Sequence, residues 1–220
     1  MTTPKRGRVV YLSGIDGTGK TTQAELLVAS FRASGIAARY VWLRFPQYLS
    51  LPVLGLSRLL GVTRYRTLNG QRVGHWEFGR ARWLARLLLW TQVVDARIAA
   101  ARRIEPLLAA GVTVVVDRFV YDILVDIASA ADEPSLLDGR AARRLLRLVD
   151  PASAILLDAP VDVIRRRRRD LEADDSLAVR ADLYRRLAAR LGVRTIDATQ
   201  TRDAVQRTLV GRAPSSLALE

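Results

Sequence analysis

The residues GIDGTGKTT at positions 14–22 combine glycines, a lysine and hydroxyl side chains at a spacing suited to binding phosphate groups. Gly14, Gly19, Lys20 and Thr21 occupy the defined positions of the pattern G-x-x-x-x-G-K-[ST], after an apolar run and before an amphipathic stretch. Glycines let backbone N–H groups converge on an anion, and a helix N-terminus adds positive potential. The alternative is a glycine-rich turn that binds nothing. We predict an ATP-binding loop formed by Gly14, Asp16, Gly17, Thr18, Gly19, Lys20, Thr21 and Thr22.

An acidic and a basic residue, Asp117 and Arg118, follow the apolar run VTVVV at 112–116. An acid at the end of a buried strand, beside a phosphate loop, is the arrangement that holds Mg²⁺ directly or through water. Thr21 and Asp117 are therefore the candidate metal ligands, and the alternative for Asp117 is a simple cap of the strand end. Arg118 is placed to neutralise phosphoryl charge.

Asp16 and Arg44 are candidates for the phosphoryl acceptor. Asp16 lies inside the phosphate loop, where its carboxylate would bind an acceptor hydroxyl group or help to organise Mg²⁺. Arg44 follows the apolar run at 38–43 and would project over the same edge of a sheet. For Arg44 a solvated arginine is the alternative.

Five consecutive arginines occupy positions 165–169, and the acids Asp174 and Asp175 follow. On a helix such a run points in all directions, so its members cannot all face one ligand. We predict a lid at 165–176 that supplies one or two arginines to the transferring phosphoryl group. The alternative is a solvated helix end.

The elements that would position these residues alternate along the chain. Apolar runs typical of buried parallel strands lie at 8–13, 38–43, 112–116, 154–158 and 194–196. Helical patterns lie at 21–33, 83–109, 121–131, 139–148, 161–169, 177–191 and 202–210. This alternation predicts a doubly wound parallel sheet in one domain over 1–212, with a tail at 213–220. Ligands of such sheets bind at the carboxyl ends of the strands, where all the motifs fall. The glycine-rich segment 46–83 is irregular, and we expect helix and loop there, on the acceptor side.

Composition limits the classes of function. The chain of 220 residues has no cysteine, which excludes disulfide and thiolate chemistry and fits a reducing compartment. It has no apolar run of membrane-spanning length, so we expect a soluble, cytoplasmic protein. Its net charge of +13 predicts an anionic partner, or else reflects an arginine-rich composition. No RNA-binding signature supports a nucleic-acid partner. Homodimer formation is left open.

An ordered set of motifs resembles the thymidylate kinases, which are P-loop nucleoside-monophosphate kinases. The resemblance spans about residues 8–210 and rests on Gly14–Thr22 with Asp16, Arg44-Phe45-Pro46, Asp117-Arg118-Phe119, the arginine helix and Ile196-Asp197-Ala198. It implies a three-layer fold around a five-stranded parallel sheet of order 2-3-1-4-5. It also implies that Arg167 lies near the adenine of ATP, in a pocket that Ala198 and Thr199 would line. Catalytic roles would belong to Asp16, Lys20, Arg118 and Arg167. Acceptor contacts would come from Asp16, Arg44, Phe45, Val93, Arg97, Arg118 and Asp122.

The acceptor side departs from that family. Val93, or its neighbour Gln92, stands about where the family has a phenylalanine that stacks on thymine, one turn before Arg97, and the nearest aromatic residue is Trp90. After Asp-Arg the chain carries Asp122 and Asp126, two acids on one helical face. These departures suggest an acceptor other than thymidylate.

We predict an enzyme that transfers the γ-phosphoryl group of ATP, with Mg²⁺, to a small acceptor, most simply a nucleoside monophosphate. A rival hypothesis is a kinase of a nucleoside, a sugar derivative or a biosynthetic intermediate, because acids suit hydroxyl groups or amines. Two further hypotheses are a nucleotide-binding module on nucleic acid and a nucleotide-dependent switch without kinase activity.

Overall fold

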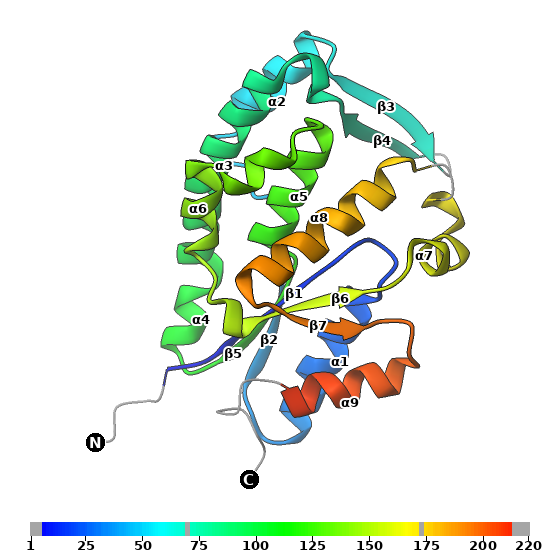
Figure 1. Ribbon diagram of the computed structural model, residues 1–220. Helices are drawn as coiled ribbons and strands as arrows, with labels where there is room; N and C mark the ends of the chain where they lie inside the picture. Colours follow the sequence, from blue (N-terminus) through cyan, green and yellow to red (C-terminus); the bar gives the residue numbers. More distant parts are fainter. Residues whose placement is uncertain (1–5, 69–70, 172–173, 213–220) are drawn as a thin grey trace.

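Five apolar runs form one parallel sheet in the computed structural model, which describes residues 6–68, 71–171 and 174–212 (Figure 1). Of 64–68, 71–75 and 212 it describes only the backbone. The strands are β1 (Val9–Ser13), β2 (Ala38–Trp42), β5 (Thr113–Asp117), β6 (Ala154–Asp158) and β7 (Arg194–Asp197). They lie in the order β2-β5-β1-β6-β7, and every neighbouring pair is parallel. Numbered among themselves along the chain, this is the predicted order 2-3-1-4-5.

The central strands consist of β-branched and other apolar residues, because both faces of the sheet are covered. All five residues of β5, TVVVD, are buried. Asp117, the last of them, lies in register with Leu12 of β1 and with Trp42 of β2. The sheet therefore brings Asp117 beside the end of β1, where the phosphate loop begins.

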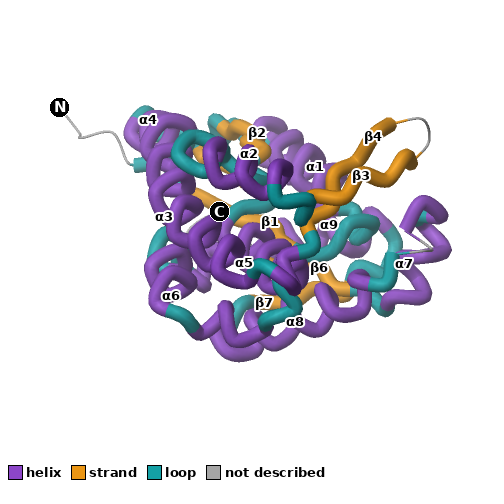
Figure 2. The backbone as a smooth tube through the Cα atoms, turned by 90° about the horizontal axis from the view of Figure 1, so that it is seen from above, coloured by secondary structure: helices purple, strands orange, loops and turns teal. Residues whose placement is uncertain are grey.

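Helices cover both faces of the sheet (Figures 1 and 2). On one face, α1 packs on β1, β2 and β5 and against α9, which also contacts β7. On the other face α3, α5 and α8 pack together, with α4 and α6 beside them. Their bounds are α1 Lys20–Ala33, α3 Arg82–Arg103, α4 Glu105–Ala109, α5 Val120–Ala130, α6 Arg140–Leu146, α7 Val161–Arg167, α8 Ser176–Leu191 and α9 Arg202–Arg212. Short 3₁₀ helices lie at Phe78–Arg80, Pro134–Asp138, Pro151–Ser153 and Arg169–Leu171.

One predicted helix, 83–109, is two helices in the structure. Helix α3 ends at Arg103, and α4 begins at Glu105 with a proline in its first turn. Pro106 has no N–H group to continue the hydrogen-bond pattern of α3, so the chain starts a new helix there.

The segment 46–83 contains a helix and a hairpin. Helix α2 (Leu51–Leu59) is followed by β3 (Thr63–Leu68) and β4 (Gln71–Trp76), which pair antiparallel in a separate sheet. The hairpin extends toward the side of the molecule that carries α7 (Figures 1 and 2). Helix and loop were expected here, and the hairpin was not. An Asn-Gly dipeptide at 69–70 separates the two strands in the sequence, and this composition is typical of a tight hairpin connection.

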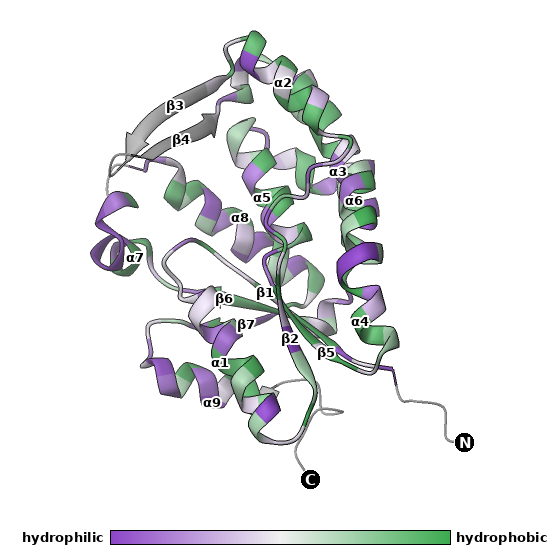
Figure 3. Ribbon diagram, turned by 180° about the vertical axis from the view of Figure 1, so that it is seen from behind, coloured by the Kyte–Doolittle hydropathy of each residue, from purple (hydrophilic) through white to green (hydrophobic). Residues whose placement is uncertain are grey.

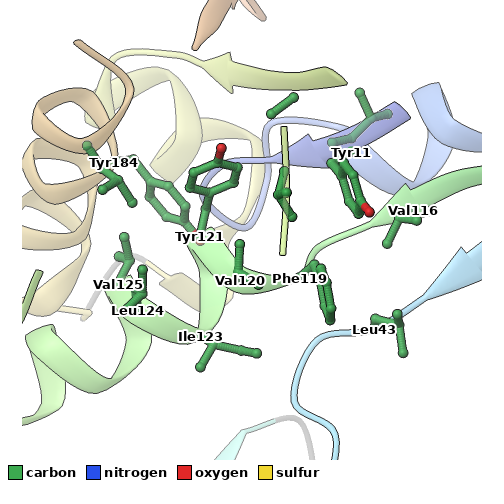
Figure 4. Packing of buried hydrophobic residues seen from close by; sticks show 14 of the residues in the cluster. Tyr11, Leu43, Val116, Phe119, Val120, Tyr121, Ile123, Leu124, Val125 and Tyr184 are labelled. Carbon is green, nitrogen blue, oxygen red and sulfur yellow. The ribbon is translucent and has the colours of Figure 1, made fainter. Parts of the chain in front are cut away.

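A continuous cluster of buried apolar residues joins the two helical layers to the sheet (Figure 4). Within it the rings of Tyr11 on β1 and Phe119 after β5 stack with centroids 5.9 Å apart. In the part of the chain that the structure describes, no helix is long and apolar enough to cross a membrane. The predicted tail at 213–220 lies outside the described residues, as do 172–173 of the predicted lid.

Candidate active site

The phosphate loop joins β1 to α1 through three glycines with left-handed backbone conformations. Gly14, Gly17 and Gly19 have φ angles of +140°, +94° and +84°, which L-residues with side chains rarely adopt. Two of them are also tightly enclosed. A Cβ atom on Gly14 would lie 2.3 Å from the carbonyl oxygen of Leu157, and one on Gly17 would lie 3.1 Å from Cγ of Arg168. The loop thus needs glycine for its shape, and the segment after α7 packs directly on it.

Lys20, the first residue of α1, folds its side chain over this loop. Its Nζ donates a 2.6 Å hydrogen bond to the carbonyl oxygen of Ile15 and lies 3.5 Å from Oγ1 of Thr18. The side chain is buried. Burial, together with the nearby cation of Arg118, lowers the pKa of Lys20 to about 8, while Asp16 and other acids oppose that shift. The ammonium group therefore lies among the loop atoms that would surround bound phosphates.

Asp117 and Thr21 meet at the end of β5. The Thr21 hydroxyl donates a 2.6 Å hydrogen bond to Oδ2 of Asp117, and the Tyr40 hydroxyl donates to the same oxygen at 3.0 Å. The other oxygen, Oδ1, is buried and has no hydrogen-bond partner among the described residues. A carboxylate oxygen and a hydroxyl group are hard ligands that suit Mg²⁺, which keeps several waters and needs few protein ligands. The oxygen atoms of Thr21 and Asp117 therefore fit Mg²⁺ as ligands. The described residues contain no group of three or more His, Cys, Asp and Glu side chains that could hold a metal. Tyr40 was not predicted, because the parallel register that brings it to Asp117 is a tertiary feature.

Arg118 is held between two carboxylates. Its φ angle of +67° is unusual for a residue other than glycine, and such strain often marks functional positions. Its guanidinium forms an ion pair with Asp16 and lies 3.3 Å from Oδ1 of Asp122. Burial opposes ionisation of Asp16, but Arg118, Lys20 and Arg44 outweigh it and hold the pKa of Asp16 well below its usual value. The site therefore keeps a charged Asp16 paired with a charged Arg118 beside the phosphate loop.

A second charged group lies at the end of β2. Arg44 places Nη2 3.7 Å from Asp16 and Nε 3.6 Å from Asp126, and its side chain is 40% exposed. On the far side of Asp126, Arg180 of α8 lies 3.9 Å away and also binds Asp174 at 2.5 Å. Arg180 was not predicted, because nothing in its local sequence distinguishes it from the other arginines of α8.

The acceptor-side residues predicted on α3 and α5 differ in their exposure. Val93 is buried, while Arg97, one turn further along α3, is exposed. Asp122 is completely buried and bonded within the fold. Phe45, next to Arg44, packs on Trp76 of β4 with ring centroids 4.9 Å apart. The structure thus joins Arg44 and Asp16 directly, and it brings an unpredicted tryptophan to Phe45.

Two arginines of the predicted lid, Arg167 and Arg168, lie at different places. Arg167 donates hydrogen bonds to the carbonyl oxygens of Ala198 at 2.7 Å and Thr199 at 3.4 Å. The stem of Arg168 packs on Gly17, and its guanidinium pairs with Asp170 at 2.6 Å. Helix α7 lies at the periphery as one of the most hydrophilic segments (Figure 3). The arginine over the phosphate loop is therefore Arg168, which was not singled out from the sequence.

Comparison with known proteins gives two relatives. No family model matches the sequence. A thymidylate kinase of Ruegeria pomeroyi is 31% identical over 157 residues, which cover 71% of this chain and 61% of that protein. A probable thymidylate kinase of Thermococcus gammatolerans is 31% identical over 163 residues, which cover 73% of this chain and 70% of that protein. The match thus spans less than two thirds of the length of the Ruegeria protein.

Proposed function

Since this chain belongs to the thymidylate kinase family, we propose that it transfers the γ-phosphoryl group of ATP to a nucleoside monophosphate. The observation that carries the proposal is the arrangement of Lys20, Asp16 and Arg118. Lys20 lies buried over the glycine loop, and Arg118, which forms an ion pair with Asp16 of that loop, lies beside it. Phosphoryl transfer needs little covalent work from the protein, and catalysis comes from positioning and from charge stabilisation.

On the donor side, the loop amides and Lys20 would bind the phosphates of ATP. Thr21 and Asp117 would hold Mg²⁺, which when bound neutralises charge on the β- and γ-phosphates. Arg167 would close the adenine end, since it already bonds to the carbonyls of Ala198 and Thr199. Arg168, above Gly17, is the lid arginine nearest the phosphates in this proposal.

On the acceptor side, Arg44 and Arg118 would bind the phosphate of the nucleoside monophosphate. Both already pair with Asp16, so Asp16 would hold the two cations in place until the acceptor binds. This arrangement favours an acceptor that brings its own negative charge, because two guanidinium groups face it. Phe45 and Trp76 supply the aromatic surface next to Arg44.

A panel of acceptors tests this proposal and the predicted departure from thymidylate. Turnover would be measured by ADP formation with dTMP, dUMP, CMP, UMP, AMP and GMP, with thymidine and aminosugars as unphosphorylated controls. We expect turnover with a monophosphate and a raised KM for dTMP, because a buried Val93 cannot stack on thymine, a contact worth about 1–3 kcal/mol.

Two results would contradict these expectations separately. Turnover of thymidine or an aminosugar but of no monophosphate would replace the proposed acceptor class. Should dTMP be the best acceptor, with kcat/KM above about 10⁴ M⁻¹s⁻¹, an ordinary value for an enzyme on its own substrate, the base is recognised by residues other than that at 93.

We also infer a homodimer, from an exposed apolar stripe on α3. Trp83, Leu87, Trp90 and Val94 repeat at a spacing of four, three and four residues, and each is between 40% and 54% exposed. This spacing is that of a helix seam which packs on another helix. The adjoining helix α2 is also mostly hydrophobic (Figure 3) and exposes Leu59. A second copy of this chain would cover such a surface.

Replacing Trp90 with glutamate should therefore give a monomer, because it puts a charge in the centre of the stripe. The molar mass in solution, measured by light scattering, would be close to twice the chain mass for the original protein and equal to it for Trp90→Glu. Val179→Glu, at an exposed apolar residue of α8, is the matched control and should leave the mass unchanged. A monomeric original protein would refute the dimer.

A further inference from the structure

Asp122 is a buried carboxylate with all of its hydrogen-bonding capacity used inside the protein. Oδ2 accepts from the hydroxyl of Ser13 at 2.8 Å and from the backbone N–H of Phe119 at 3.3 Å. Oδ1 accepts from Arg118 at 3.3 Å and from the hydroxyl of Tyr184 at 2.8 Å. The side chain is fully buried. A carboxylate so enclosed would contact neither ATP nor the phosphoryl acceptor. Any effect of Asp122 on the reaction must therefore pass through the residues that it binds.

Tyr184 reaches this carboxylate from a different helix. It lies on α8, which packs against α5, the helix of Asp122. Its ring lies among the buried apolar residues of the cluster (Figure 4). Burial and the neighbouring carboxylate of Asp122 raise the pKa of Tyr184 well above its usual value. The hydroxyl group therefore stays protonated and donates a hydrogen bond to Asp122. Tyr184 therefore binds the same oxygen that faces Arg118.

The guanidinium of Arg118 is suspended between Asp16 in the phosphate loop and Asp122. Asp16 lies in a loop and is partly accessible, whereas Asp122 is locked into the core by its other donors. Of these two partners, Asp122 is the one held rigidly in the core. The orientation of the Arg118 guanidinium therefore depends mainly on Asp122.

We propose that Tyr184 is a positioning residue for phosphoryl transfer, which fixes the Asp122 carboxylate and through it the guanidinium of Arg118. The inference rests on the proposed function, in which Arg118 stabilises the transferring phosphoryl group. Tyr184 touches no substrate. Without the Tyr184 hydroxyl, Ser13 and Phe119 hold the Asp122 carboxylate only at Oδ2. The carboxylate can then turn, and Arg118, anchored mainly by Asp16, shifts away from the charge that develops in the transition state.

A second contact one turn earlier on α8 supports this role for the helix. Arg180 lies 3.9 Å from Asp126, and Asp126 lies 3.6 Å from Arg44. Tyr184 and Arg180 are four residues apart on α8, as Asp122 and Asp126 are on α5. The two helices therefore meet through two polar contacts, Tyr184 with Asp122 and Arg180 with Asp126. Asp122 in turn binds Arg118, and Asp126 binds Arg44, the two arginines proposed to bind the acceptor. Helix α8 thus acts on Arg118 through Tyr184 and Asp122, and on Arg44 through Arg180 and Asp126.

Tyr184→Phe removes one hydroxyl group and keeps the ring that packs in the core. We expect kcat to fall about ten-fold, the size for one lost hydrogen bond to a charged group, with KM for ATP unchanged. Tyr121→Phe is the matched control. The hydroxyl of Tyr121 is also buried, on the same helix as Asp122, but it has no hydrogen-bond partner in the described part of the chain. This variant should keep its full kcat.

A double-mutant cycle separates positioning from a merely structural effect. If Tyr184 acts through Arg118, Tyr184→Phe lowers kcat about ten-fold in the original protein and has no further effect in an Arg118→Ala background. The same ten-fold loss in both backgrounds, or no loss in either, would overturn the inference while the proposed function stands. An original protein that transfers no phosphoryl group to any acceptor would instead overturn the proposed function, and the inference with it. Thermal unfolding of each variant confirms that the compared proteins are folded.

Discussion

Lys20→Ala should lower kcat/KM for phosphoryl transfer by about 100-fold or more, the usual cost of removing one charged contact from a developing anionic transition state. Lys20 is the only lysine in the phosphate loop, and its ammonium lies buried against Ile15 and Thr18. Steady-state kinetics with ATP and the best acceptor of the panel would measure the loss. Lys5→Ala, at the chain's only other lysine, is the matched control and should retain full activity. A near-normal kcat/KM in Lys20→Ala would refute the assignment of the loop.

The charge on Lys20 also predicts how ATP affinity depends on pH. Because the pKa of Lys20 is lowered to about 8, the ammonium is largely present below pH 8 and is lost as the pH rises above it. ATP binding favours the charged form, so affinity in metal-free buffer should fall between about pH 8 and pH 9.5. Lys20→Arg keeps its charge across this range and should show a flat profile. A fall of the same size in both proteins would mean that another group titrates.

Asp117→Asn should abolish most of the Mg²⁺ dependence of activity, with a loss in kcat of about 100-fold. Oδ1 of Asp117 has no hydrogen-bond partner among the described residues, so it is the atom that would bind the metal or its water. An amide is a poorer ligand that carries no charge. ATP affinity in metal-free buffer should change little. The Asp117 carboxylate binds the hydroxyl groups of Thr21 and Tyr40 and would contact the metal rather than ATP itself.

The matched control is Asp158→Asn, at the end of strand β6, which lies on the other side of β1 from β5. Asp158 pairs with Arg185 at 2.7 Å and should not affect the Mg²⁺ titration. Equal losses for Asp117→Asn with and without Mg²⁺ would show that Asp117 only caps the hydroxyl groups of Thr21 and Tyr40.

The sheet and the phosphate loop could be predicted because their signals are local. Strands β1 and β5 are short apolar runs, and the loop between Gly14 and Lys20 is a contiguous pattern whose glycines the backbone geometry requires. The strand order came from the family resemblance rather than from the residues alone. The hairpin β3–β4 was missed because the surrounding glycines and aromatic residues obscured its one strong turn signal.

Much of the proposed acceptor side could not be predicted, because it depends on which helix covers which face of α5. The spacing of Asp122 and Asp126 indicates one helical face, but it does not tell whether that face meets a substrate or another helix. In the fold α8 covers it, and Tyr184 and Arg180 bind the two acids. Tyr40 reaches Asp117 in a similar way, across paired strands. Such long-range contacts leave no mark in the local sequence.

The most direct test of the central claim follows the γ-phosphoryl group itself. ATP labelled with ¹⁸O in that group would be incubated with the protein, Mg²⁺ and the panel of nucleoside monophosphates, and the products identified by mass spectrometry. We expect the label to leave ATP only when an acceptor is present. One labelled nucleoside diphosphate should then form for each unlabelled ADP that the donor leaves behind. Label that appears in inorganic phosphate without an acceptor, or that stays in ATP under all conditions, would contradict the assignment of a nucleoside-monophosphate kinase.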